Sequence, residues 1–147
     1  MSVLSETVRR QIFEVLSTDL ILNELTPGDF HHQVAPQGTA SPFVVYFRSS
    51  NLATYAFANN LVFEKDLWMI KALAESDAAS SVSPEQQVED VLSRIDTLLN
   101  GMSFTLEGAT ILLMRRIGDI TPYIEQVSAD QVVHHHGSMY EVTINNG

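Results

Sequence analysis

The sequence predicts an α+β fold, in which a mixed, mainly antiparallel β-sheet is covered by an N-terminal helix and by one long helix at about residues 84–100. Apolar residues recur with a helical period in those two segments, and several short β-prone runs lie between and after them. A chain of 147 residues without an internal repeat has the usual size of one domain. We therefore expect a single domain spanning residues 1–147.

The first half of the chain is expected to form one amphipathic helix, a short helical piece and three strands. In residues 3–16 the apolar side chains fall within one arc of about 120°, and the Thr26-Pro27-Gly28-Asp29 turn ends any helix that follows. The remaining expectations are a helical piece at 20–25, strands at 30–34 and 43–47, a loop or loose helical turn at 49–60, and a long strand, or alternatively a buried helix, at 61–74.

The second half contains the clearest helix signal. Ser83 can cap the helix that Pro84 begins, and Asn100-Gly101 provides a stop. After this helix we expect strands at 103–106 and 109–117, a loop that contains Gly118, Asp119 and Pro122, and a half-buried final strand at 139–144.

Composition excludes several classes of function. Without cysteine, the chain has neither disulfides nor thiolate chemistry. A net charge of −10 opposes binding to a phosphate backbone, and no apolar run reaches the roughly 20 residues that span a bilayer. The N-terminus lacks the pattern of a secretory signal, and the common catalytic motifs are missing. We expect a protein that assembles with other proteins, without catalytic residues or cofactors, rather than an enzyme.

The histidines offer the main alternative. On a strand His134 and His136 would share a face and form half of a zinc site, which His31 or His32 would have to complete. Because no carboxylate sits at ligand spacing beside them, the favoured interpretation is an exposed polar segment before the last strand, with no metal bound. A metal-dependent hydrolase is thus one rival function. A ligand-binding domain with its pocket beneath Trp68 is another, although a lone tryptophan in an apolar run usually packs in the core.

Charge is distributed unevenly along the chain. Residues 75–96 carry six carboxylates against Arg94 alone, a local net charge of −5, on Glu75, Asp77, Glu85, Glu89, Asp90 and Asp96. Arg115 and Arg116 end an apolar run, where they could pair with this acidic segment of a neighbouring copy or simply form a solvated strand end.

Several segments together resemble the tail-completion, or tail-terminator, proteins of tailed bacteriophages. They are Leu67-Trp68-Met69-Ile70-Lys71-Ala72, the helix at 84–99 with its Gly101 stop, and the closing run from Gly137 to Ile144, preceded by an initial helix and a strand led by Pro42. The resemblance covers most of the chain in length and order of elements. It departs from the family pattern in residues 49–60 and in having His134, His135 and His136 where basic residues are usual.

The resemblance implies a virion protein at the head–tail junction, assembled in the host cytoplasm. Such a protein forms a ring of copies, typically six-fold, that stops tail-tube polymerisation and contacts the tail-tube protein and the head-side connector, while DNA passes through without specific binding. A head-completion or connector (neck) protein is the nearest alternative. Carboxylates facing such a channel would repel the duplex within about one Debye length, ~8 Å. We therefore expect Glu85, Glu89, Asp90 and Asp96 to line the channel, with a solvated outer face that aids solubility as the alternative, and Arg115 and Arg116 to lie between subunits.

Overall fold

The computed structural model describes residues 3–55, 61–76, 81–106 and 109–145 of the chain. In chain order these residues form α1 (Val3–Ser17), α2 (Leu20–Leu25), β1 (Phe30–His32), β2 (Phe43–Tyr55), β3 (Leu61–Glu75), α3 (Pro84–Leu99), β4 (Met102–Leu106), β5 (Ala109–Gln126) and β6 (Val132–Asn145). The mixed sheet and its accompanying helices confirm the predicted α+β class.

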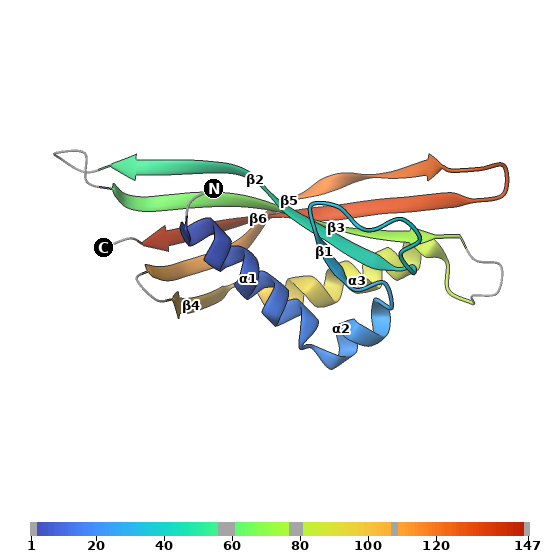
Figure 1. Ribbon diagram of the computed structural model, residues 1–147, viewed down its shortest axis with the longest axis horizontal. Coiled ribbons are helices and arrows are strands. Elements are labelled where there is room, and N and C mark those ends of the chain that lie inside the picture. Colours follow the sequence, from blue (N-terminus) through green and yellow to red (C-terminus); the bar gives the residue numbers. More distant parts are fainter. Residues whose placement is uncertain (1–2, 56–60, 77–80, 107–108, 146–147) are drawn as a thin grey trace.

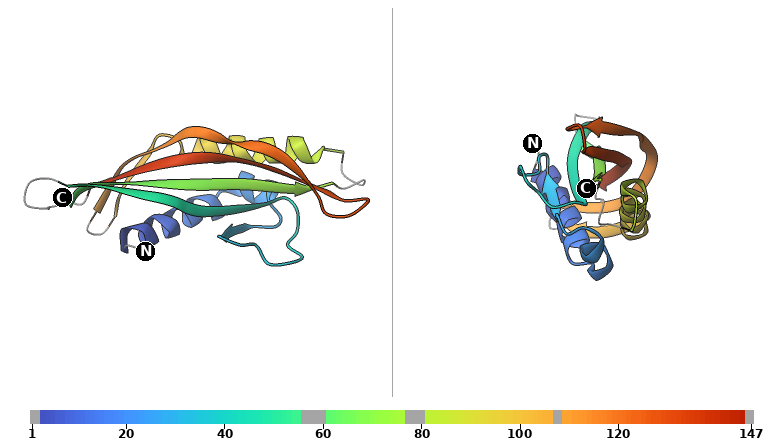
Figure 2. Two further views of the ribbon diagram at one scale, coloured as in Figure 1. Left: turned by 90° about the horizontal axis from the view of Figure 1, so that it is seen from above. Right: turned by 90° about the vertical axis from the view of Figure 1, so that its right-hand side faces the viewer.

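The strands form one six-stranded sheet in the order β1-β2-β3-β6-β5-β4. The pair β1–β2 is parallel and the other neighbouring pairs are antiparallel. The long strands make a twisted layer, and α1, α2 and α3 lie on one side of it (Figures 1 and 2). One face of the central sheet is thus covered by helices and the opposite face is not.

The long helix α3 begins where the sequence predicts. The Ser83 hydroxyl oxygen accepts a hydrogen bond from the backbone N–H of Gln86 at 3.2 Å, and Pro84 occupies the first turn, where a missing N–H costs nothing. The buried side of the helix repeats every three to four residues, at Val88, Val91, Leu92, Ile95 and Leu99. The predicted helix at 84–100 is confirmed to within one residue.

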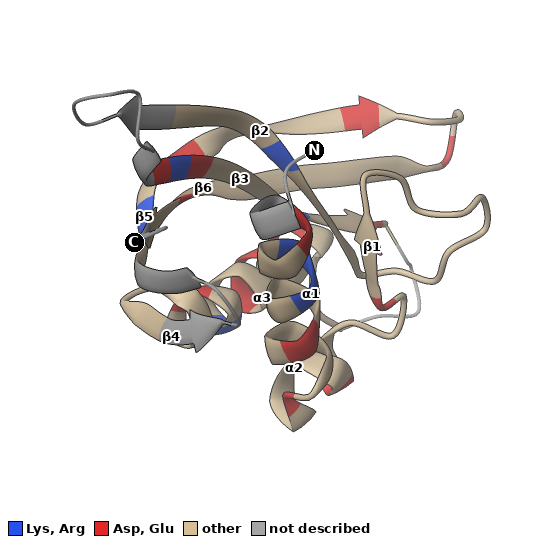
Figure 3. Cartoon of the chain, turned by 60° about the vertical axis from the view of Figure 1, so that its left-hand side comes forward, with Lys and Arg blue, Asp and Glu red and all other residues tan. Residues whose placement is uncertain are grey.

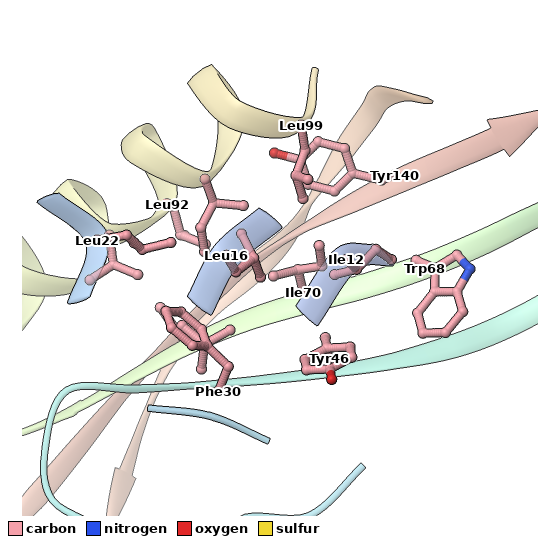
Figure 4. Packing of buried hydrophobic residues seen from close by; sticks show 14 of the residues in the cluster. Ile12, Leu16, Leu22, Phe30, Tyr46, Trp68, Ile70, Leu92, Leu99 and Tyr140 are labelled. Atoms are coloured by element: carbon pink, nitrogen blue, oxygen red, sulfur yellow. The ribbon is translucent and has the colours of Figure 1, made fainter. Parts of the chain in front are cut away.

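The core lies between the helices and one face of the central strands (Figure 4). In β3 the side chains that alternate toward the helices, Trp68 and Ile70 among them, are fully buried. They meet Ile12 and Leu16 of α1 and Leu99 of α3. The expectation that Trp68 is a core residue is confirmed, and residues 61–74 form a strand rather than a helix. Met69, between Trp68 and Ile70, points to the uncovered face of the sheet and is only half-buried.

Three strand predictions were wrong in the same direction, because the strands are longer than local sequence suggests. β2 continues to Tyr55 through the expected loop, β5 continues through Gly118 and Pro122 to Gln126, and β6 begins at Val132. Pairing with the long strand β3 extends β2 and β6, and β6 in turn extends β5. β5 accommodates its two turn-forming residues at register shifts between Arg116 and Gly118 and between Ile120 and Tyr123. Residues 56–60 lie outside the described part.

Candidate functional site

The sheet leaves long stretches of two strands without an outer neighbour. β1 pairs with only the first part of β2, as far as Tyr46, and β4 pairs with β5 no further than Met114. Within the described ranges, no strand pairs with the outer side of β2 after Tyr46 or of β5 after Met114. An unpaired strand edge presents backbone donors and acceptors to a partner. We call these two stretches the open edges of β2 and β5.

The ends of β5 and β6 form an exposed hairpin, which we call the arm (residues 121–130). It extends past the helices at one end of the sheet (Figure 1), and each of its residues is exposed. Its apolar side chains are unusually accessible for a sheet, since Tyr123 is 47% exposed, Ile124 62% and Val127 55%. Apolar side chains gathered on an exposed element are typical of a contact surface.

His135 connects the base of the arm to the sheet. Its imidazole, 7% exposed, stacks on the ring of Tyr123 with the centroids 4.2 Å apart, and its Nε2 donates a hydrogen bond to the Glu125 carboxylate at 2.8 Å. Burial lowers the pKa of His135, while the hydrogen bond to Glu125 opposes that shift. The ring is therefore neutral with its proton on Nε2, so Nδ1 is an acceptor, and this buried atom has no hydrogen-bond partner.

The histidine triplet lies within β6, not in an exposed segment before it. His134 and His136 share a face, as strand alternation predicts, and His135 points to the other. His31 and His32 lie on β1, which β2 and β3 separate from β6. They cannot complete a site with the triplet. Across the described ranges, no group of three metal-ligating side chains is placed to hold an ion.

A groove runs between α3 and the strands β5 and β6. Its upper part, about 200 Å³, is lined by Glu85, Val88 and Glu89 of α3, by Tyr123 and Ile124 of β5, and by the three histidines of β6. Its lower part, about 320 Å³, shares Glu89 and His136 with the upper part and adds Asp96, Arg116 and Asp119. We call the two parts together the α3 groove.

Apart from Glu89, the charged side chains in the lower part of the α3 groove are paired within the chain. Asp96 accepts a hydrogen bond from the Tyr140 hydroxyl at 3.1 Å and lies 3.5 Å from the Arg116 Nε. Burial raises the pKa of Tyr140, and the nearby Asp96 raises it further. Arg116 also reaches Asp119, and Arg115 reaches Glu141 at 3.3 Å. Both arginines expected between subunits thus have partners inside their own chain, and an inter-subunit role for them stays a prediction.

The carboxylates in and near the upper part of the α3 groove differ from those in the lower part in how many partners they have. Glu85 and Glu89 are exposed, and in the part of the chain that the structure describes neither makes an ion pair or a hydrogen bond. Asp90, which follows Glu89 on α3, is exposed and accepts a hydrogen bond from the Gln86 side chain at 2.8 Å. Glu75 accepts one from Gln131, also at 2.8 Å, and Asp77 lies outside the described residues. The upper groove therefore concentrates unpaired negative charge beside apolar walls.

No described helix is long and apolar enough to cross a membrane.

Comparison with known proteins finds likeness among solved structures. No family model matches the sequence, and no curated protein matches it. Among solved structures, the chain is similar to one in a structure described as the virion of a native gene transfer agent (GTA) particle, with a TM-score of 0.63 over 91% of each chain and 13% sequence identity. At that identity the likeness establishes a shared fold.

Proposed function

We propose that this chain is a structural, non-enzymatic subunit of a phage-like virion. In this proposal, copies of the chain form a ring at the head–tail junction, and the ring ends tail-tube polymerisation and contacts the head connector. The observation that carries the proposal is the fold shared, over nine-tenths of both chains, with a chain of a gene transfer agent virion. The resemblance of the sequence to tail-terminator proteins supports the finer assignment, including a typically six-fold ring.

The directions of the strands support a ring. Neighbouring strands alternate in direction from β2 through β3 and β6 to β5, so β2 and β5 run oppositely. The open edge of β5 in one copy can therefore pair with the open edge of β2 in the next and continue the antiparallel pattern. One such heterologous contact, repeated from copy to copy, closes into a ring when the rotation per copy allows it.

The positions of the open edges add a constraint. The open edge of β2 lies toward the hairpin end of β2 and β3, whereas that of β5 lies toward the arm, at the opposite end of the sheet (Figure 1). Copies joined through these edges are displaced along the strand direction. Such a stagger tilts the strands relative to the axis of a closed assembly, as closed sheets require.

The channel-lining role of Glu85, Glu89, Asp90 and Asp96 stays a hypothesis. Glu85, Glu89 and Asp90 are exposed on α3, as a channel wall requires, whereas Asp96 is bonded to Tyr140. If the hypothesis holds, Glu85→Lys with Glu89→Lys should leave the ring assembled and add salt-sensitive retention of DNA.

The proposed function is tested with particles assembled without this chain. The proposal expects tail tubes of uncontrolled length that do not join heads, and expects wild-type chain supplied in trans to restore both length and joining. Electron microscopy measures tube length and head attachment separately. Tubes of normal length that fail only to join heads would contradict the terminator role and favour a neck protein.

A further inference from the structure

The open edge of β2 ends at a fixed point. β1 covers the outer side of β2 as far as Tyr46, where the backbone N–H of Gln33 donates a hydrogen bond to the Tyr46 carbonyl oxygen at 3.0 Å. β1 runs parallel to β2, so the end of β1 points along the open edge (Figure 3). A strand added antiparallel to β2 therefore approaches β1 end to end. Such a strand can pair with β2 from Tyr55 back to Phe47, and β1 stops it there.

The arm is held in line with the sheet. At its base the ring of Tyr123 stacks on His135, and His135 donates a hydrogen bond to the Glu125 carboxylate. Lys71 of β3 reaches the Tyr123 hydroxyl at 3.4 Å. These contacts lie on the uncovered face of the sheet and join three strands. The open edge of β5 therefore continues the sheet to Gln126, where the arm turns.

The end of β1 sets the register at which the two open edges fit. In an antiparallel pair, residues opposite each other point to the same face of the sheet. Phe47 lies beside Met69 on the uncovered face. Glu125 follows Tyr123 by two residues and points to that face as well. With Glu125 opposite Phe47 of the next copy, β5 ends where β1 ends, and the two open edges run side by side.

This register displaces neighbouring copies along the strands. Within one copy, Phe43 lies in the same row across the sheet as Tyr123, whereas in the next copy that row meets β2 near Ser49. The shift of about six residues is ~20 Å, and the four strands from β2 to β5 are together ~19 Å wide. The strands then incline by about 45° to the axis of a closed ring, close to the roughly 35–45° tilt of closed sheets. The register is therefore compatible with closure.

The side chains that meet at the end of β1 are apolar and exposed. Val34, two residues after β1, is 77% exposed, and Val127, one residue after β5, is 55% exposed. The charges around them are opposite in sign. The arm carries the carboxylates of Glu125 and Asp130 and no basic residue, whereas Arg48 is the only charged residue of β2. The arm and the open edge of β2 are thus complementary in charge, and their exposed valines can cover each other.

We propose that the arm of one copy pairs with the open edge of β2 in the next copy and that its tip docks against the end of β1, with Val127 on Val34. This inference rests on the proposed ring and identifies the contact that fixes the register between its copies. The short strand β1 then acts as a register stop. One fixed register gives every copy the same rotation to the next, as a closed ring requires.

Substitutions at the two valines test the contact. Association of the purified full-length chain, alone and on tail tubes, is measured by sedimentation and negative-stain microscopy. Val34→Asp and Val127→Asp should each weaken association at least tenfold, because a carboxylate enters an apolar contact. Val34→Lys should restore most of the association that Val127→Asp loses, since opposite charges then face each other. Val82→Asp is the matched control, because this exposed valine precedes α3, away from both open edges, and should leave association unchanged.

A second measurement uses the absence of cysteine from the chain. Val34→Cys protein is mixed with Val127→Cys protein under mild oxidation, and the proposal expects a cross-linked pair of copies that Val82→Cys protein does not form with Val127→Cys protein. The contact is overturned if rings form without this cross-link, or if Val127→Asp assembles as well as wild type. In either case the proposed ring stands with a different contact. If wild type forms no ring, alone or on tail tubes, the proposed function fails and the contact fails with it.

Discussion

The strands β5 and β6 have a part covered by helices and a part that forms the exposed arm, and the two parts have opposite surroundings. In the covered part of β6, Tyr140 and Val142 are fully buried against the helices. In the arm, residues 121–130 of the adjoining hairpin are all exposed, including Tyr123 and Ile124. The chain thus continues one pair of strands well beyond the layer that stabilises the fold. Extra strand length of this kind serves contact with partners more readily than stability.

Charged side chains under the helices have partners within the chain, whereas two of those beside the arm have none among the described residues. Under the covered face, Asp19 caps α2 by accepting from the Leu22 N–H and binds the Arg94 guanidinium at 2.7 Å, which ties α2 to α3. Arg94 lowers the pKa of Asp19. Beside the arm, Glu85 and Glu89 have no such partner in the described structure. The ion pair of Asp19 and Arg94 thus joins two elements of the fold, whereas Glu85 and Glu89 are exposed beside the arm.

The largest expected effect separates a buried leucine from an exposed one. Leu92→Ala removes a buried side chain of α3 that packs into the core, and should lower the free energy of unfolding by ~2–5 kcal/mol through a cavity. Leu20→Ala makes the same change on α2, where the leucine is exposed, and should cost no more than about 0.5 kcal/mol. Chemical denaturation of both variants measures the difference. Equal losses would mean that α3 does not pack as described.

A smaller effect is expected where the two regions meet, at His135. Because burial lowers the pKa of His135, the unfolded chain takes up a proton before the folded one as the pH falls through the ordinary histidine value of 6.5. The free energy of unfolding should therefore decrease below that pH, and His135→Gln should make it depend less on pH. His32, whose pKa burial also lowers, should contribute the remainder. Denaturant melts from pH 7.5 to 5 measure both contributions, and an unchanged slope in His135→Gln would contradict the first.

The smallest effect on stability is expected in the arm. Ile124→Ser should change the free energy of unfolding by no more than about 0.5 kcal/mol, because the isoleucine is already exposed. If the arm contacts the next copy in the proposed ring, the same variant should also associate more weakly. Ile70→Ser is the comparison, because it places a hydroxyl in the core and should destabilise the monomer severely. An arm variant that unfolds as easily as the core variant would remove the distinction between the two regions.

Local signals predicted the helices well and the groove hardly at all. Ser83, Pro84 and the apolar period of residues 88–99 identify α3, because capping and amphipathicity act within a few residues. The same period places Glu85 and Glu89 at the edge of the apolar arc, which is where they line the groove. Nothing local indicates that Tyr123 and Ile124 form the opposite wall. Pro122 suggested a loop there, although the β-prone residues after it were an available signal for a strand.

The amino-acid sequence by itself determined the fold class, the long helix, the buried position of Trp68 and the acidic character of α3, because hydrophobic period, capping and charge are properties of short segments. Only the tertiary structure decided how far β2, β5 and β6 extend, which charges are paired and which strand edges stay open. Strand length and ion pairing depend on residues distant in the chain, such as β3 beside β2 and Asp19 beside Arg94. Hydrogen bonding to a long neighbouring strand outweighs the local preference of Gly118 and Pro122 for a turn.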